Sequence, residues 1–193
     1  MSQNRLNFTS LDFETANRSC VSICAAGMAV FEDGKLTESR YWLVRPPDGR
    51  RWFREDFTEI HGLTWFDVRD APAFPAIAIE LLQRLTRSDI VVAHNAKFDM
   101  GALYATLNHF GLDCPEFDYV CTCQLARRVW PELPSHSLDA LAAHIGHQFN
   151  HHHAQADAEA AGRVLLAMMK QVNANTLREL LHKAGMEPRR FCH

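Results

Sequence analysis

The chain has 193 residues, 47% of them apolar and 22% charged, which is the size and balance of one soluble globular domain. Its formal charge of −3 argues against nucleic-acid binding by a broad basic surface, but not against a grip on a few phosphates through metal ions. No run approaches the roughly 18–20 apolar residues that cross a bilayer, and residues 1–5 are polar with no secretory signal, so we expect a cytoplasmic protein without membrane contact.

Three strands are expected first, forming an antiparallel meander. Residues 7–15, 21–31 and 36–44 are rich in alternating or continuous apolar side chains, a pattern typical of strands. The pair Asp33-Gly34 between the second and third strands is a strong hairpin signal. The irregular stretch 45–57, rich in proline and arginine, is a candidate functional loop.

Helices and short strands are expected to alternate in the rest of the chain. Apolar spacing predicts helices at residues 75–86, 98–110, before Pro131, 138–145 and 156–172, with strands at 90–93 and 119–121. Ser137 is expected to cap one helix, and Asn175 or Thr176 a last short one. This order predicts one α/β domain with a mixed sheet covered by helices. Residues 186–193 are expected to form a loose tail with Arg189 and Arg190 solvated.

Asp12 and Glu14 are the first candidate site residues. Two positions apart on a strand, their side chains point to the same face, while Phe13 points to the buried side. Neighbouring carboxylates repel, so one tends to keep its proton unless a divalent cation neutralises the pair. Alone, such a pair is more often simply solvated at a strand edge.

Two further acids are expected at the starts of helices. Asp99 follows the strand 90–93 at its carboxyl end, where open α/β sheets tend to place their sites. Asp157 falls in the first turn of the long helix, and His152 in the loop before it. Each acid has the ordinary alternative of offsetting the helix dipole, and a histidine before a helix is usually an ordinary polar loop residue.

Together these segments resemble the three motifs of the DEDDh (DnaQ-like) exonuclease family. They occur in the family's order and at similar separations, as Leu11-Asp12-Phe13-Glu14-Thr15, Asn95-x-x-Phe98-Asp99 and His152-x-Ala154-x-x-Asp157. Residues 60–64 and 137–141 also resemble stretches that flank that family's active site. The resemblance covers about residues 6–170, and its strength lies in all three motifs appearing in order.

The resemblance implies a ribonuclease-H-like α/β fold with helices on both faces of a mixed sheet. It implies an exonuclease domain at residues 6–172, with a short C-terminal helix and tail at 173–193 packed on it. The expected reaction releases nucleoside monophosphates from 3′ ends of single-stranded DNA or RNA. Two Mg²⁺ or Mn²⁺ ions would be held by Asp12, Glu14 and Asp157, and through water by Asp99. His152 would take a proton from the attacking water.

Substrate contacts are expected in and near these motifs, at Thr15, His61, Asn95 and Phe98. Arg51 and Trp52 join them, because cations interleaved with aromatics bind single strands by charge and stacking. Their ordinary alternative is an exposed loop with a buried tryptophan.

Any of the three consecutive histidines His151–His153 could be the base that accepts the proton of the attacking water, so the spacing to Asp157 is used to choose among them. A sister family places a tyrosine four residues before the last acid, where this chain has His153, and the spacing favours His152. A zinc site using His144, His147 and Cys121-x-Cys123 is a weaker alternative, because Cys-x-Cys is not the spacing of a common zinc knuckle. The six cysteines are expected to be free thiols.

The partner and the pathway remain open at this point. The family resemblance extends to stand-alone exonucleases and to the polymerase III proofreading subunit, which would link the chain to DNA replication or repair through a polymerase partner. Because that subunit usually carries a long C-terminal extension, we expect a stand-alone enzyme first. A catalytically silent nucleic-acid-binding relative is the second alternative. The motifs do not specify oligomeric state, processivity or a preference for DNA or RNA.

Overall fold

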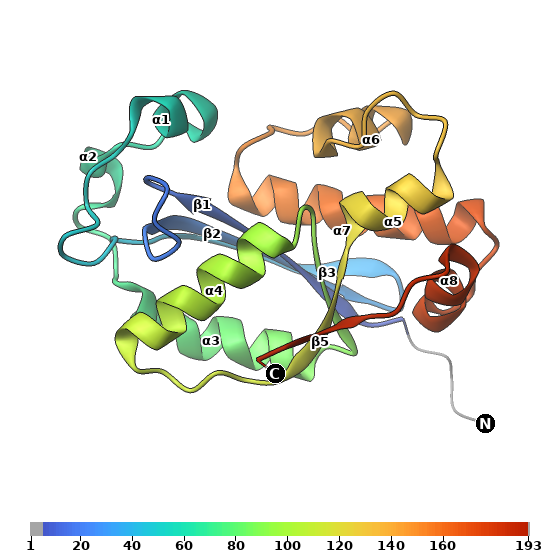
Figure 1. Ribbon diagram of the computed structural model, residues 1–193, viewed down its shortest axis with the longest axis horizontal. Coiled ribbons are helices and arrows are strands. Elements are labelled where there is room, and N and C mark those ends of the chain that lie inside the picture. Colours follow the sequence, from blue (N-terminus) through green and yellow to red (C-terminus); the bar gives the residue numbers. More distant parts are fainter. Residues whose placement is uncertain (1–5, 193) are drawn as a thin grey trace.

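The computed structural model describes residues 6–192, so the polar segment 1–5 and the last residue of the predicted tail lie outside the described residues. Six strands form one sheet in the order β3-β2-β1-β4-β5-β6, and helices cover both of its faces (Figure 1). This is the predicted ribonuclease-H-like α/β architecture. No helix of the described part is long and apolar enough to span a membrane.

The first three strands form the predicted meander. β1 (Phe8–Thr15), β2 (Ile23–Glu32) and β3 (Lys35–Leu43) pair antiparallel. Asp33 and Gly34 join β2 to β3 with φ values of 49° and 72°, as expected of a two-residue hairpin turn that needs positive φ twice.

Parallel strands then bring two chain segments to one edge of the sheet. β1 pairs in parallel with β4 (Ile90–Ala93), and β4 pairs in parallel with β5 (Phe117–Cys121). The carboxyl ends of these strands therefore meet at the same edge, where the segments that follow β1 and β4 lie close together.

Each face of the sheet has its own apolar core. Helices α3 (Phe74–Arg87) and α4 (Lys97–Phe110) cover one face, and α5 (Thr122–Val129), α6 (Leu138–His144), α7 (Ala154–Gln171) and α8 (Leu177–Ala184) cover the other. In β1, Leu11 and Phe13 join the core under α3 and α4, whereas Phe8 joins the core under α7. Strand alternation therefore puts Asp12 and Glu14 on the α7 face.

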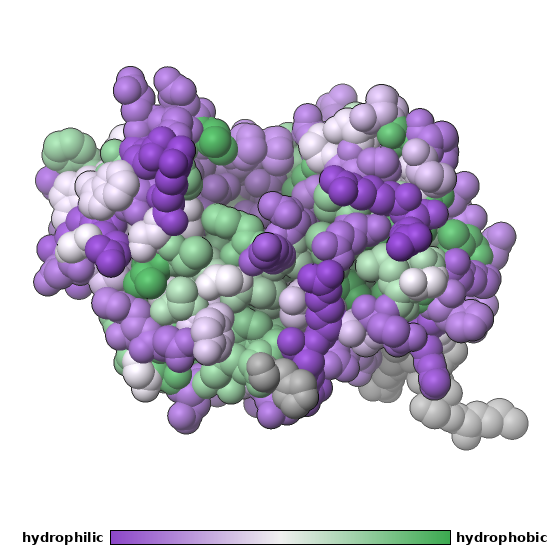
Figure 2. All heavy atoms as spheres, viewed as in Figure 1, coloured by the Kyte–Doolittle hydropathy of each residue, from purple (hydrophilic) through white to green (hydrophobic). Residues whose placement is uncertain are grey.

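The space-filling view shows α4 from outside. Apolar residues gather over α4, and polar residues cover most of the rest of this face (Figure 2). The exposed part of α4 includes Phe98 and Tyr104, which are 40% and 52% exposed.

Several local details differ from the prediction. The irregular stretch is shorter than expected, because α1 (Glu55–His61) begins within it and α2 (Trp65–Val68) follows. Helix α7 begins two residues earlier than predicted. Ser137 stands at the N-cap position of α6, but its hydroxyl makes no capping hydrogen bond; it lies 2.9 Å from the Ser135 hydroxyl instead.

The prediction of a loose C-terminal tail was wrong. Residues Arg189–Phe191 form β6, which pairs antiparallel with β5. Phe191 is buried and stacks on Phe117, with 4.7 Å between the ring centroids. Arg190, expected to be solvated, donates hydrogen bonds to Glu116 and Asp118. The short strand is therefore held by the stacked Phe191 ring and by the ion pairs of Arg190, in addition to its pairing with β5.

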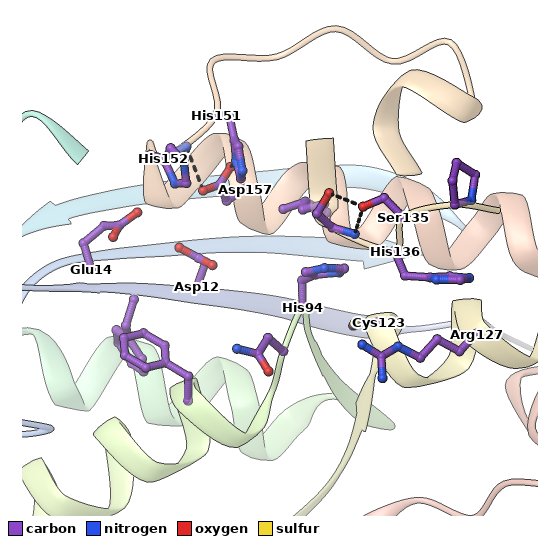
Figure 3. A pocket seen from close by; sticks show the side chains of 16 residues that line it. Asp12, Glu14, His94, Cys123, Arg127, Ser135, His136, His151, His152 and Asp157 are labelled. Atoms are coloured by element: carbon purple, nitrogen blue, oxygen red, sulfur yellow. Dashed lines mark hydrogen bonds and ion pairs between the residues drawn. The ribbon is translucent and has the colours of Figure 1, made fainter. Parts of the chain in front are cut away.

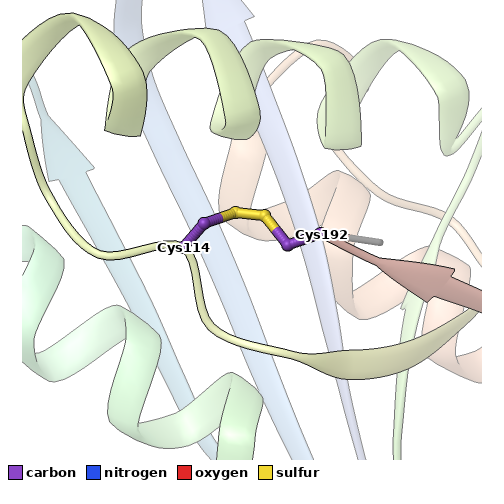
Figure 4. The surroundings of a disulfide bond; sticks show 2 residues. All are labelled: Cys114 and Cys192. Carbon is purple, nitrogen blue, oxygen red and sulfur yellow. A yellow bond between two sulfur atoms is a disulfide. The ribbon is translucent and has the colours of Figure 1, made fainter.

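The prediction of six free thiols was also wrong. Cys114 and Cys192 form a disulfide bond across 78 positions, with their Cα atoms 6.1 Å apart (Figure 4). The other four cysteines are free. The pairing of β6 with β5 brings Cys192 beside the segment that precedes β5, a proximity that spacing along the chain does not reveal.

Candidate active site

Three carboxylates converge at the edge where β1 ends. Asp12 and Glu14 project from β1 towards α7, and Asp157 projects from the first turn of α7 (Figure 3). Ligand oxygens of these three residues all lie within 4.8 Å of one another. The sequence separates Asp157 from the other two by more than 140 positions, so only the docking of α7 on the sheet brings them together.

A glycine contact allows this docking. Gly27 of β2 is the register partner of Asp12, and a Cβ added to it would lie 2.0 Å from the carbonyl carbon and oxygen of Ala154. At Gly162, further along α7, an added Cβ would lie 2.2 Å from the Phe31 ring. The helix therefore crosses the sheet at backbone distance, which sets how far Asp157 reaches towards Asp12. The sequence analysis did not identify this contact.

Asp99 approaches the same edge from the other face. It lies in the first turn of α4 and is 1% exposed. Its Oδ1 accepts a hydrogen bond of 3.0 Å from the backbone N–H of Phe13, which lies between Asp12 and Glu14. Its Oδ2 is buried without a hydrogen-bond partner among the described residues. A buried carboxylate oxygen without a partner is costly, so this atom calls for a water or an ion.

The pKa values of all four carboxyl groups are raised. Burial, followed by repulsion from Asp99, Glu14 and Asp157, raises the pKa of Asp12 well above its usual range. Burial and then the charges of Asp157 and Asp99 raise the pKa of Glu14 to about 8. Burial outweighs two backbone hydrogen bonds and raises the pKa of Asp99 to about 8. It also raises the pKa of Asp157, against the contact with His151.

This donor set fits divalent cations. Clustered carboxylates that repel one another are stabilised in their ionised form when a cation lies among them, and hard cations such as Mg²⁺ and Mn²⁺ prefer oxygen ligands. The residues that can hold such an ion directly are Asp12, Glu14 and Asp157. Asp99 lies outside that group, although its Oδ1 accepts a hydrogen bond from the backbone N–H of Phe13, the residue between Asp12 and Glu14.

Two of the three histidines contact Asp157. The backbone N–H of His152 donates to Asp157 Oδ2 at 3.0 Å, and Nδ1 of His151 donates to Asp157 Oδ1 at 2.9 Å. The rings of His151 and His152 stack at 3.8 Å. His153 instead stacks on Tyr41 of β3 at 4.2 Å. The sequence analysis gave His151 no role; three consecutive histidines before the helix were the only signal.

The ring of His152 is suited to accept a proton. Burial, and after it the charge of His151, lowers its pKa below the usual value, so the imidazole is neutral at neutral pH. Its φ of 64° places it in the left-handed region, where the chain turns into α7. His152 lines the same cleft as the three carboxylates.

The predicted substrate contacts are divided between the cleft and its surroundings. Asn95 and Phe98 line a cleft of about 780 Å³ together with Asp12, Glu14 and Asp157. Thr15 and His61 are not among its lining residues; Thr15 is buried, and its carbonyl accepts a hydrogen bond of 3.2 Å from His61 Nε2.

The structure does not bring Arg51 and Trp52 into this cleft. Arg51 forms an ion pair with Asp48 and lies over the Trp65 ring, 5.3 Å from its centroid. Trp52 is 54% exposed, so it is not the buried tryptophan of the ordinary alternative.

The other half of the cleft was not identified from the sequence. It is lined by His94, Cys123, Arg127, Ser135 and His136, which come from the end of β4, from α5 and from the segment before α6 (Figure 3). Burial lowers the pKa of His94 to about 4, and its Nδ1 lies 2.9 Å from the Thr122 hydroxyl. The sequence offered one signal for His94: it directly precedes Asn95, which was predicted to contact the substrate.

Comparison with known proteins identifies the family of this chain. Residues 11–165 match the sequence model of the RNase_T family, described as an exonuclease. The DNA polymerase III PolC-type of Streptococcus pneumoniae serotype 2 is 34% identical over 116 residues, which are 60% of this chain and 8% of that polymerase. The PolC-type polymerase of Streptococcus agalactiae serotype III is 29% identical over 91% of this chain and 12% of its own length. The chain thus spans a small part of these relatives.

Solved structures share the fold. Exonuclease X, in complex with 5′ overhanging duplex DNA, superposes with a TM-score of 0.70 at 24% identity, covering 92% of this chain and 99% of that one. The nuclease domain of 3′hExo, a DEDDh family member bound to rAMP, gives 0.73 at 14% identity, covering 91% and 96%. Product-bound exonuclease I gives 0.75 at 15% identity, covering 91% and 45%.

Proposed function

We propose that the chain, which belongs to the RNase_T exonuclease family, is a 3′–5′ exonuclease that removes nucleotides one at a time with two divalent ions held by Asp12, Glu14 and Asp157. The observation that carries this proposal is the convergence of the three carboxylates within 4.8 Å. Two ions are proposed because a pair can stabilise both the attacking and the leaving oxygens of an in-line displacement. Mg²⁺ and Mn²⁺ are the proposed ions because all the acidic ligands offer oxygen.

The side chains would divide the work as follows. Asp12 and Asp157 lie where both can share one ion, and Glu14 extends the set towards a second. Asp99 would contribute through water, since its Oδ1 is engaged with the Phe13 N–H and its Oδ2 is free of protein partners in the described chain. His152 would accept the proton of the attacking water, a role worth roughly 10²–10⁴ in rate.

The proposed substrate is a nucleic-acid 3′ end in single-stranded form. Phe98 lines the cleft beside the acids and is 40% exposed, which makes it available to stack on a terminal base. Asn95 lines the cleft with it and offers hydrogen-bonding groups to the nucleotide. Exonuclease X was solved with duplex DNA carrying a 5′ overhang and 3′hExo with rAMP, so we propose that both DNA and RNA be tested.

The test is cleavage of matched DNA and RNA oligonucleotides labelled at the 5′ end, with Mn²⁺ or Mg²⁺ and with EDTA. A ladder that shortens from the 3′ end, needs the metal and disappears in Asp12→Ala supports the proposal. A ladder that Asp12→Ala also produces would indicate a contaminating nuclease. No cleavage by the wild type under any condition would favour the silent binding relative.

A second candidate is proofreading beside a polymerase, which the 34% identity with a PolC-type polymerase favours. In that case the chain would remove mismatched 3′ ends faster than matched ones, because a frayed end costs less to unpair. Initial rates on primer–template pairs with matched and mismatched 3′ ends, with and without a replicative polymerase, distinguish the two roles. A stand-alone enzyme would give rates that the polymerase does not change.

A further inference from the structure

The cleft extends beyond the carboxylates to a second, basic end. Figure 3 shows Glu14, Asp12, His94 and Arg127 succeeding one another along it, with Ser135 and His136 on the facing segment. The proposed function uses only the acidic end. The basic end is part of the same continuous cleft, so a strand whose 3′ end is at the acids must leave the site past one end or the other.

Arg127 supplies the permanent positive charge of the cleft. Among the described residues that line it, Arg127 is the only arginine or lysine. The ion pairs of the described chain use other arginines: Arg40, Arg51, Arg54, Arg69, Arg84 and Arg190. Arg127 contacts the thiol of Cys123, one turn earlier on α5. Its guanidinium is thus exposed, held near the cleft and without an acidic partner there.

The wall that faces Arg127 is fixed by hydrogen bonds. Nε2 of His136 donates to the Trp130 carbonyl at 2.9 Å. The Ser135 hydroxyl accepts from the backbone N–H of Ser137 at 3.3 Å. His94 bonds both the Thr122 hydroxyl and the backbone of His136, so β4, α5 and the segment before α6 are tied at one point. A rigid wall with a hydroxyl and a guanidinium suits phosphate more than a base.

The two ends differ in what they can recognise. Phe98 directly precedes Asp99 and so lies at the acidic end, where an aromatic ring can stack on the terminal base. Among the described residues that line the basic end, none is a phenylalanine, tyrosine or tryptophan, and Arg127 offers the fork of donors with which arginine binds phosphate oxygens. The terminal nucleoside therefore fits the acidic end, and the rest of the strand fits the basic end.

We propose that Arg127 binds the phosphate one nucleotide 5′ of the scissile phosphate, so that the strand leaves the site over α5. This assignment rests on the proposed exonuclease function, whose acidic end it complements. Arg127 is then a residue that positions the substrate, with no part in the bond-breaking step.

The test combines a variant with a modified substrate. Release of the 3′-terminal nucleotide is measured for the wild type, Arg127→Ala, Arg127→Lys and the matched control Arg128→Ala, whose exposed side chain does not line the cleft. One oligonucleotide is unmodified, and the other carries a neutral methylphosphonate one linkage 5′ of the scissile one. A charge-assisted hydrogen bond at an exposed site is worth about a 10-fold effect.

On the unmodified strand, Arg127→Ala should raise KM about 10-fold with kcat nearly unchanged, and Arg127→Lys should recover part of the loss. The methylphosphonate should impair the wild type and Arg128→Ala equally, while costing Arg127→Ala nothing further. Equal sensitivity of Arg127→Ala and the wild type to the methylphosphonate would overturn the assignment, as would a loss confined to kcat.

A binding measurement separates this proposal from the proposed function. Fluorescence anisotropy of the same two oligonucleotides is recorded on an Asp12→Ala background, where cleavage does not interfere. Arg127→Ala should weaken binding of the unmodified strand about 10-fold and leave binding of the modified strand unchanged. If the wild type does not cleave the oligonucleotide, the proposed exonuclease function is wrong. The binding measurement still tests whether Arg127 contacts the phosphate.

Discussion

Gly27 of β2 and Ala154 of α7 touch backbone to backbone: a Cβ on the glycine would lie 2.0 Å from the carbonyl carbon of Ala154. Because Gly27 is the register partner of Asp12 and Ala154 lies three residues before Asp157, this contact sets the separation of two of the three clustered carboxylates. A side chain here would push the start of α7 away from the sheet.

Gly27→Ala should therefore lose both stability and activity. Overpacking of this kind costs roughly 1–3 kcal/mol, and the displacement of Asp157 should reduce kcat by at least about 10-fold, since misplacement by about 1 Å can cost far more. Thermal melts and oligonucleotide cleavage measure the two effects. Gly101→Ala in α4 is the matched control, because an added Cβ there meets nothing within 4 Å; its melting temperature should stay the same or rise slightly. Equal behaviour of the two variants would contradict the role of the contact.

Single alanine variants of the three histidines should separate their roles. His152→Ala should reduce kcat by roughly 10²–10⁴-fold, because its neutral ring lines the cleft. His153→Ala should keep most activity, since that ring packs on Tyr41. His151→Ala removes a hydrogen bond to Asp157 and should fall between them. Initial rates at saturating metal give the comparison. Similar losses in His152→Ala and His153→Ala would show that the base is wrongly assigned.

Metal should stabilise the folded chain through Asp157. An ion that binds only the folded state adds about 2.7 kcal/mol at a hundredfold excess over its Kd, which corresponds to a rise in Tm of roughly 5–10 °C for a chain of this size. Melts with and without Mn²⁺ should show this rise in the wild type and little of it in Asp157→Asn. Equal shifts in both proteins would place the ion elsewhere.

Without metal, stability should fall as the pH rises from about 6.5 to 8, above the range in which the histidines with lowered pKa values titrate. The folded pKa values of Glu14 and Asp99 are raised to about 8, whereas the unfolded values are about 4. The folded state thus holds more protons in this window, and the free energy of unfolding decreases with pH. In EDTA we expect a fall in Tm of roughly 5 °C between pH 6.5 and 8, smaller in Asp99→Asn. A Tm that rises with pH in EDTA would contradict the predicted loss of stability.

The disulfide should stabilise the fold without affecting catalysis. Removing a disulfide from a folded domain costs roughly 2–5 kcal/mol, so Cys192→Ser and the reduced wild type should melt at a similarly lowered temperature. Cleavage rates well below that temperature should be unchanged, because Cys114 precedes β5 and so lies at the end of the sheet opposite the carboxylates. Cys20→Ser, which replaces an exposed free thiol, is the control and should melt like the wild type.

The parts of the site that follow local rules could be predicted from the sequence. Alternation along β1 placed Asp12 and Glu14 on one face, and the Asp33-Gly34 turn set the register of the meander. Asp99 after a buried strand and Asp157 in a first helical turn were placed by the ends of their elements. In each case the information lies within about ten residues of the side chain concerned.

The parts that depend on distant segments could not be predicted. The Cys114–Cys192 bond and β6 depend on pairing across more than 70 positions. The contact of Gly27 with Ala154, and the basic end of the cleft around Arg127, appear only when α7 and α5 are packed on the sheet. Arg51 and Trp52 lie outside the cleft lining, and the contacts of Arg51 with Asp48 and Trp65 could not be read from the composition of the loop; substrate binding by these residues stays a prediction.

The docking of α7 also has a consequence for how the protein is made. Asp12 and Glu14 emerge from the ribosome long before Asp157, and a domain generally folds as a unit. A nascent chain that has emerged only as far as β5 therefore lacks Asp157, one of the three clustered carboxylates. The proposed hydrolytic activity would therefore arise in a single late step of folding, when α7 packs against Gly27.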